Sequence, residues 1–207
     1  MGSVWLADHL ALKTQVVVKF MLGELRASSS ARARFGREAA AAAQVKSPHV
    51  VQVFDHGVTD DGVPFIVMEH LEGRSLGDLL REGGPLPPAE VASIVSQMCR
   101  ALGRVHAAGI LHRDIKPDNV FLLDGEGDER YFVKLLDFGI AKNVERDREG
   151  EGGEGSERAD TTQTKTGQVV GTPYYMSPEQ VTAQKDPDHT SDLWSVGVLA
   201  YEAMVGA

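Results

Sequence analysis

Cysteine and aromatic residues are scarce in this chain of 207 residues, which holds one cysteine, Cys99, and an aromatic content of 6%. A single cysteine excludes an internal disulfide framework and a cysteine-rich metal site. This usage fits a reducing, cytoplasmic setting best. We expect Cys99 to be a core residue of a long helix rather than a nucleophile.

Basic residues are also few, with 21 Lys and Arg against 30 Asp and Glu and a net charge of −9. Nucleic acids and anionic membranes reward clustered Lys and Arg, so the balance argues against either as the main partner. No run reaches the roughly 18 apolar residues of a membrane helix, and no secretory leader is visible. We therefore expect no membrane segment in this chain, although a parent protein could carry an anchor elsewhere.

The chain has two parts that differ in their expected secondary structure, with a boundary between residues 71 and 73. Before it, strand patterns cover residues 4–22, 50–58 and 63–71, and an alanine-rich helix follows the serines at 28–30. After it, the pattern is mostly helical, with a long amphipathic helix over residues 88–108. Residues 145–160 hold seven acids and are expected to form a solvated loop.

Four short motifs occur in a fixed order. Lys19 ends the run VVVK, His112–Asn119 reads HRDIKPDN, Asp137–Gly139 reads DFG, and residues 171–179 read GTPYYMSPE. Each motif alone is modest evidence, but the ordered set is hard to obtain by accident. The chain resembles the eukaryotic-like protein kinase family, and within it the bacterial Ser/Thr kinases.

The resemblance implies an α+β, two-lobed fold. Residues 1–71 would form part of an antiparallel-sheet N-lobe with one main helix, and 72–207 part of a mostly helical C-lobe. The resemblance also implies a domain truncated at both ends, because Gly2-Ser3-Val4 matches only the last part of the family's glycine-rich loop. With fewer backbone N–H groups over the phosphates, we expect a lowered affinity for ATP.

Phosphoryl transfer depends on positioning and on neutralising charge. By resemblance, Asp114 accepts the proton of the substrate hydroxyl, and Lys116 stabilises the transferred phosphoryl group. Lys19 clamps the α- and β-phosphates and is held by Glu38, although Glu38 could instead be a solvated residue of its helix.

A metal site follows from the same resemblance. Asn119 and Asp137 would hold Mg²⁺, with Mn²⁺ as an alternative, because carboxylate and amide oxygens suit such hard cations.

Adenine recognition would fall to the linker between the lobes and to apolar residues around it. The Glu69 carbonyl and the Leu71 amide would face the base, and Met68 would be the gatekeeper. The residues expected to surround ATP besides Lys19 are Gly2, Val4, Val17, Met68, Glu69, Leu71 and Phe121.

The resemblance also implies regulatory phosphorylation sites and residues with structural roles around the site. A phosphate on Thr164 or Thr166 would pair with Arg113 and order the activation loop. Thr172 would contact the substrate beside the phosphorylated residue. Structural roles fall to His112 packed against Phe138, to Asp192 holding the catalytic loop, and to Glu179, whose usual Arg partner is expected to be lacking.

The sequence thus predicts a protein Ser/Thr kinase that uses ATP and Mg²⁺ on protein substrates and autophosphorylates. The alternative is a catalytically weak or inactive fragment that acts as a binding module. Retention of Lys19, Glu38, Asp114, Asn119 and Asp137 favours the enzyme. A small-molecule kinase is disfavoured by the segment at 171–179, and dimerisation with a second kinase domain stays open.

Overall fold

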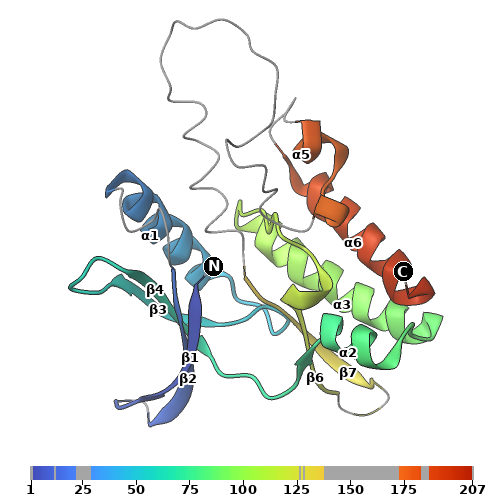
Figure 1. Cartoon of the computed structure of the whole chain (residues 1–207), viewed down its shortest axis with the longest axis horizontal. Helices are drawn as coiled ribbons and strands as arrows, with labels where there is room; N and C mark the ends of the chain where they lie inside the picture. The colour runs from blue at the N-terminus through green and yellow to red at the C-terminus, as the bar shows by residue number, and fades with distance from the viewer. Residues whose placement is uncertain are drawn as a thin grey trace, which may run out of the picture.

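The computed structural model describes residues 2–11, 13–21, 29–125, 127, 129–137, 173–182 and 187–206. Within these ranges a four-stranded sheet and a three-stranded sheet lie side by side, and most helices lie on the side of the second sheet (Figure 1). This arrangement confirms the expected α+β class.

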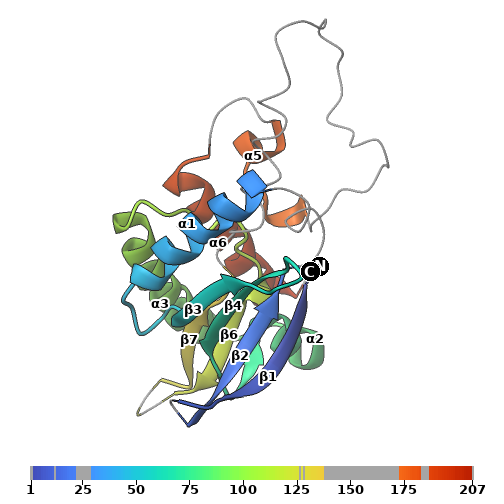
Figure 2. The ribbon, with the colours of Figure 1, turned by 90° about the vertical axis from the view of Figure 1, so that its left-hand side faces the viewer.

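The first sheet is antiparallel throughout and has the order β1-β2-β4-β3. Its strands are β1 (Ser3–His9), β2 (Thr14–Phe20), β3 (Val53–Val58) and β4 (Pro64–Glu69). The valines of β2 favour a strand, and a turn at Thr59–Val63 joins β3 to β4. Helix α1 (Ser29–Gln44) crosses this sheet in Figure 2 and buries Phe35, Ala39 and Ala42.

The second sheet is small, and the sequence pattern, which predicts a mostly helical region here, does not indicate it. Its strands β5 (Arg74–Ser75), β6 (Val120–Asp124) and β7 (Tyr131–Leu135) pair in the order β5-β6-β7. Along β6 and β7 buried residues alternate with half-buried ones, so one face of the sheet meets the core.

Two helices contact the second sheet, α2 (Leu76–Gly83) and α3 (Pro88–Ala107). Helix α6 (His189–Val205) packs on α3 instead, and α5 (Pro178–Thr182) precedes it in the chain. Short 3₁₀ turns lie at Pro117–Asn119 and Pro173–Tyr175. Among the described helices, none is both long and apolar enough to cross a membrane.

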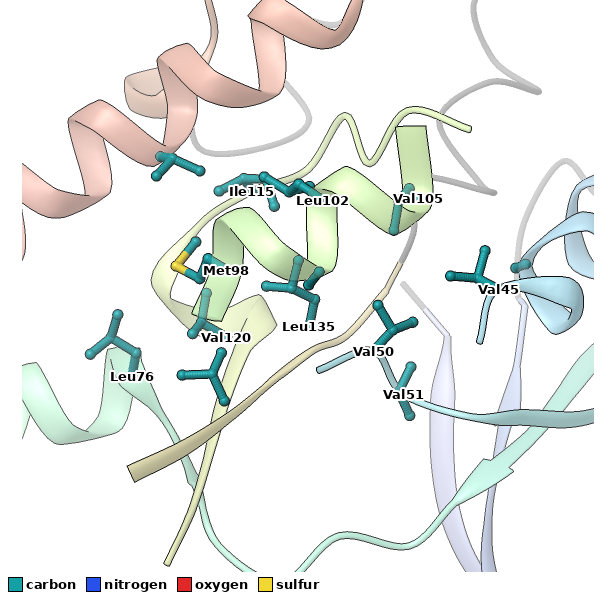
Figure 3. Packing of buried hydrophobic residues seen from close by; sticks show 14 of the residues in the cluster. Val45, Val50, Val51, Leu76, Met98, Leu102, Val105, Ile115, Val120 and Leu135 are labelled. Atoms are coloured by element: carbon teal, nitrogen blue, oxygen red, sulfur yellow. The ribbon is translucent and has the colours of Figure 1, made fainter. Parts of the chain in front are cut away.

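The core centres on α3. Met98, Leu102 and Val105 of this helix are buried against Val120 and Leu135 of the second sheet (Figure 3). Fully burying one such side chain contributes about 1.5–3 kcal/mol. Helix α3 therefore packs against one face of the second sheet and contributes to the same core as Ile115 of the loop that precedes β6.

One position on α3 differs from expectation. We predicted Cys99 as a core residue, but its side chain is exposed. The neighbouring Met98 has no exposed surface, and one residue further along an α-helix points about 100° away. The prediction for Cys99 was therefore wrong.

Residues 49–52 connect the two sheets. His49 and Val51 pair in parallel with Leu135 of β7, through Leu135 N–H to His49 O (2.9 Å) and Val51 N–H to Leu135 O (3.0 Å). The His49 ring also hydrogen-bonds to Val133 O at 3.0 Å. This segment leads into β3, so it sets how the first sheet sits on the second.

Candidate active site

A compact polar group lies in the loop between α3 and β6. The Asp114 carboxylate accepts hydrogen bonds from Lys116 Nζ (3.0 Å) and Asn119 Nδ2 (3.0 Å). Asn119 Nδ2 also donates to the Asp114 carbonyl at 2.7 Å. Three residues that the sequence predicts to be catalytic or metal-binding therefore lie in contact. The Lys116 ammonium group neutralises the Asp114 carboxylate.

Asp137 lies beside this group because of backbone pairing. The Leu136 N–H donates to the Asn119 carbonyl at 2.9 Å, which places the next residue, Asp137, at the edge of the loop. Asp137 then forms an ion pair with Lys19 of β2 at 2.6 Å. A residue of the first sheet and a residue just after the second sheet are thus brought to one place.

The donor set at Asn119 and Asp137 fits a divalent cation. The amide nitrogen of Asn119 is directed at Asp114, so its amide oxygen points the other way. That oxygen and the Asp137 carboxylate are hard ligands of the kind that Mg²⁺ and similar ions prefer.

Two residues of the site have left-handed backbones. Arg113 has φ of 60° and Asp137 has φ of 53°. Such conformations cost side-chain-bearing residues about 1–3 kcal/mol and persist only where the surroundings impose them. They often mark functional sites, and here they lie on both sides of the polar group.

Asp192 imposes the conformation at Arg113. This side chain, in the first turn of α6 and only 2% exposed, accepts the N–H groups of His112 (2.9 Å) and Arg113 (2.8 Å). It also bonds His106 Nε2 at 2.8 Å. Asp192 therefore holds the backbone that leads into Asp114, which is the contact that the sequence predicts for it.

His112 ties the loop to the strand before Asp137. Its ring is fully buried, with Nε2 2.8 Å from Leu136 O and Nδ1 3.4 Å from Asp114 N. Burial lowers the pKa of His112, chiefly by removing water from the charged form. A neutral ring that donates from Nε2 and accepts at Nδ1 satisfies both contacts; its expected neighbour Phe138 lies outside the described residues.

The residues predicted to surround ATP lie on both sheets. Val17 of β2 is paired with Met68 of β4, whereas Phe121 lies on β6. At position 2 a side chain would approach Phe20 O to 2.0 Å, so only glycine fits there. Val4 of β1 is 61% exposed.

Two predicted contacts involve Glu38 and Glu179. Among ion pairs between described residues none joins Lys19 to Glu38; Lys19 pairs with Asp137, and the Lys19–Glu38 contact stays a prediction. The expectation that Glu179 lacks its usual Arg partner stays a prediction; its carboxylate accepts a hydrogen bond from Ser191 Oγ at 2.5 Å. That bond lowers the pKa of Glu179. Thr164, Thr166 and Thr172 lie outside the described residues.

Sequence reasoning missed two contacts near the site. The Tyr175 hydroxyl donates to Glu202 of α6, and burial followed by this bond raises the pKa of Tyr175. Both residues line a cavity of about 260 Å³ that also reaches Pro117 and Asp118 of the loop. The second contact joins Lys134 of β7 to Glu69 at 2.5 Å. No local motif marks either pair, because the partners are far apart in the sequence.

Residues 1–207 match the protein kinase domain family. The chain belongs to this family. The kinase domain is 41% identical over 206 residues to the serine/threonine-protein kinase pkn3 of Myxococcus xanthus, covering 100% of this chain and 36% of pkn3. It is 36% identical over 210 residues to PknB of Mycobacterium leprae, covering 100% of this chain and 30% of PknB.

Solved structures agree with the sequence relatives. The kinase domain matches the crystal structure of the Mycobacterium tuberculosis PknI kinase domain with a TM-score of 0.75 and 28% identity. That match covers 100% of this chain and 70% of the PknI chain. The chain thus spans about a third of the length of its curated relatives.

Proposed function

We propose that this kinase domain transfers the γ-phosphoryl group of Mg·ATP to Ser or Thr hydroxyls of proteins. The observation that carries the proposal is the meeting of Asp114, Lys116 and Asn119 beside the Lys19–Asp137 ion pair. ATP would bind between a lobe of residues 1–71 and a lobe of residues 72–207. The names of the relatives, all Ser/Thr kinases, support the choice of hydroxyl.

The loop residues have distinct tasks in this proposal. The Asp114 carboxylate orients the substrate hydroxyl and takes its proton, for which it needs to stay ionised. Lys116, 3.0 Å from that carboxylate, supplies positive charge where the phosphoryl group arrives. Asn119 keeps Asp114 in place through its amide nitrogen and offers its oxygen to the metal.

Lys19 and Asp137 would exchange partners when Mg·ATP binds. In the structure they neutralise each other at 2.6 Å, with side chains 20% and 38% exposed. Lys19 would then bind phosphate oxygens, and Asp137 would hold the metal ion. The metal's role is to neutralise charge on the phosphates. Glu38 would hold Lys19 in that state.

The adenine ring would lie between Val4 and Val17 on one side and Phe121 on the other. The backbone around Glu69 and Leu71 would bind its polar edge. This arrangement is supported by the pairing of Val17 with Met68, the residue just before Glu69.

Activation-loop phosphorylation is part of the proposal. Arg113 Nε is buried, and within the described part of the chain it has no hydrogen-bond partner. An unsatisfied buried group of this kind costs about 1–3 kcal/mol, more when it is charged. A phosphate on Thr164 or Thr166 would satisfy it and order the loop.

The test is the intact mass of the purified chain after incubation with Mg·ATP. We expect phosphate additions in the native sequence and in an Asp124→Asn control at the exposed end of β6, and none in Asp114→Asn. Absence of phosphate from the native chain would favour the alternative, a binding module without autokinase activity. Equal labelling of the Asp114→Asn chain would rule out the assigned role of Asp114.

A further inference from the structure

A half-buried ion pair joins the end of β4 to the second sheet. Lys134 Nζ lies 2.5 Å from Glu69 Oε1, and the two side chains are 15% and 21% exposed. The pair Arg74–Glu82, by contrast, is 46% and 73% exposed. Because solvent screens the Lys134–Glu69 pair less, it restrains its two residues more strongly than a surface pair does.

Three polar contacts hold Glu69 in place. Besides Lys134, its carboxylate accepts the Gln52 N–H at 2.6 Å, and its own N–H donates to Gln52 O at 3.0 Å. Gln52 belongs to the segment that pairs with β7. The side chain and backbone of Glu69 are therefore held by residues that are themselves tied to the second sheet.

Lys134 faces the place proposed for the adenine ring. In the β6–β7 pairing Lys134 lies opposite Phe121, and residues opposite each other project from the same face of a sheet. Phe121 is the proposed floor of the ATP pocket, and Glu69 follows Met68, which pairs with Val17 of its roof. The ion pair thus joins the two walls of the pocket at one end.

We propose that Lys134 is a positioning residue, which sets the affinity for ATP by holding Glu69 so that the backbone of residues 69–71 meets the adenine. This inference rests on the proposed function. Loss of the Lys134 charge leaves the Glu69 carboxylate with a single N–H partner and lets the strand end move relative to Phe121. Asp114 lies in the loop before β6, where its carboxylate is held by Lys116 and Asn119 and not by Lys134, so we expect the chemical step to change little.

The experiment compares nucleotide binding and kinetics in the full chain. Binding of a fluorescent N-methylanthraniloyl ATP analogue and the KM for ATP are measured for the native sequence, Lys134→Met, Lys134→Arg and Glu69→Gln. Arg130→Met serves as the matched control, since it breaks a nearby ion pair with Glu90 that does not touch β4. Thermal melting of each variant shows whether it is folded.

We expect Lys134→Met to weaken analogue binding and raise KM by about threefold to tenfold, a range typical of one coupled contact. The kcat should stay within about twofold of the native value. Lys134→Arg and Arg130→Met should behave like the native chain. Glu69→Gln should change analogue binding and KM as much as Lys134→Met does. A variant that carries both substitutions should lose little more ATP affinity than either single variant.

Three results would overturn the inference. Unchanged binding in a folded Lys134→Met would show that the ion pair does not position the pocket, while leaving the proposed function intact. A change in kcat with unchanged ATP affinity would show that Lys134 acts on the chemical step or on lobe movement and not on ATP binding. A native chain that does not bind the analogue would overturn the proposed function itself, and this inference with it.

Discussion

Asp192 offers the sharpest structural test, because one buried carboxylate holds two backbone N–H groups. Replacing Asp192 with alanine removes the acceptor for the His112 and Arg113 amides and for His106. Asp192 is 2% exposed, so the cavity that remains gives water little access to those donors. The Arg113 backbone would then be free to leave its left-handed conformation.

The magnitude follows from the number of donors left unsatisfied. A buried amide without an acceptor costs about 1–3 kcal/mol, and two amides therefore cost about 4 kcal/mol. That is a large part of the roughly 5–15 kcal/mol by which native domains are stable. Relaxation at Arg113 would recover part of its strain, but it would also displace Asp114 and lower activity.

Urea unfolding at neutral pH measures the effect from the midpoint and slope of the transition. Asp192→Asn, which keeps one acceptor oxygen, should lose less stability than Asp192→Ala, and Asp8→Asn on exposed β1 should lose none. A loss below about 1 kcal/mol in Asp192→Ala, typical of a surface substitution, would refute the reasoning.

Two further predictions concern stability. The buried His112 stays neutral when folded, but in the unfolded chain it binds a proton below pH 6.5; stability should therefore fall as the pH drops below that value, by up to about 1.4 kcal/mol per pH unit, and His112→Gln should lack this part of the slope. Urea unfolding between neutral and mildly acidic pH measures this dependence of stability on pH. Identical pH slopes in the native chain and in His112→Gln would contradict the prediction. Gly103→Ala, with no atom within 4 Å of the added Cβ, should raise helix stability by about 0.5–1 kcal/mol. Gly77→Ala should gain nothing, because its Cβ would lie 2.6 Å from Asp118 Oδ1; equal gains in thermal unfolding would contradict this.

The sequence predicted the helices and strands that local composition or periodicity marks. The valine-rich β2, the alanine-rich α1 and the amphipathic α3 all occur within a few residues of their expected bounds. Periodicity did not separate β6 and β7 from the helical part, because both strands are short and β6 also pairs with β5, which lies far from it in the sequence. The exposure of Cys99 was not predicted because cysteine is among the residue types most often buried, whereas this one, beside the buried Met98, lies on the exposed face of α3.

The site was predictable where motifs mark it. HRDIKPDN pointed to Asp114, Lys116 and Asn119, which meet in the structure. Lys134 and Glu69 lie 65 residues apart, and neither stands in a pattern that indicates its partner. Contacts of this kind depend on how the two sheets are placed, which spacing along the chain does not encode.

The most direct test of the central claim is a phosphoamino-acid analysis of the chain after incubation with γ-labelled ATP and Mg²⁺, beside Asp114→Asn. The account predicts label on phosphoserine or phosphothreonine in the native chain and its loss in Asp114→Asn. Label on phosphotyrosine, or equal label in both chains, would contradict it.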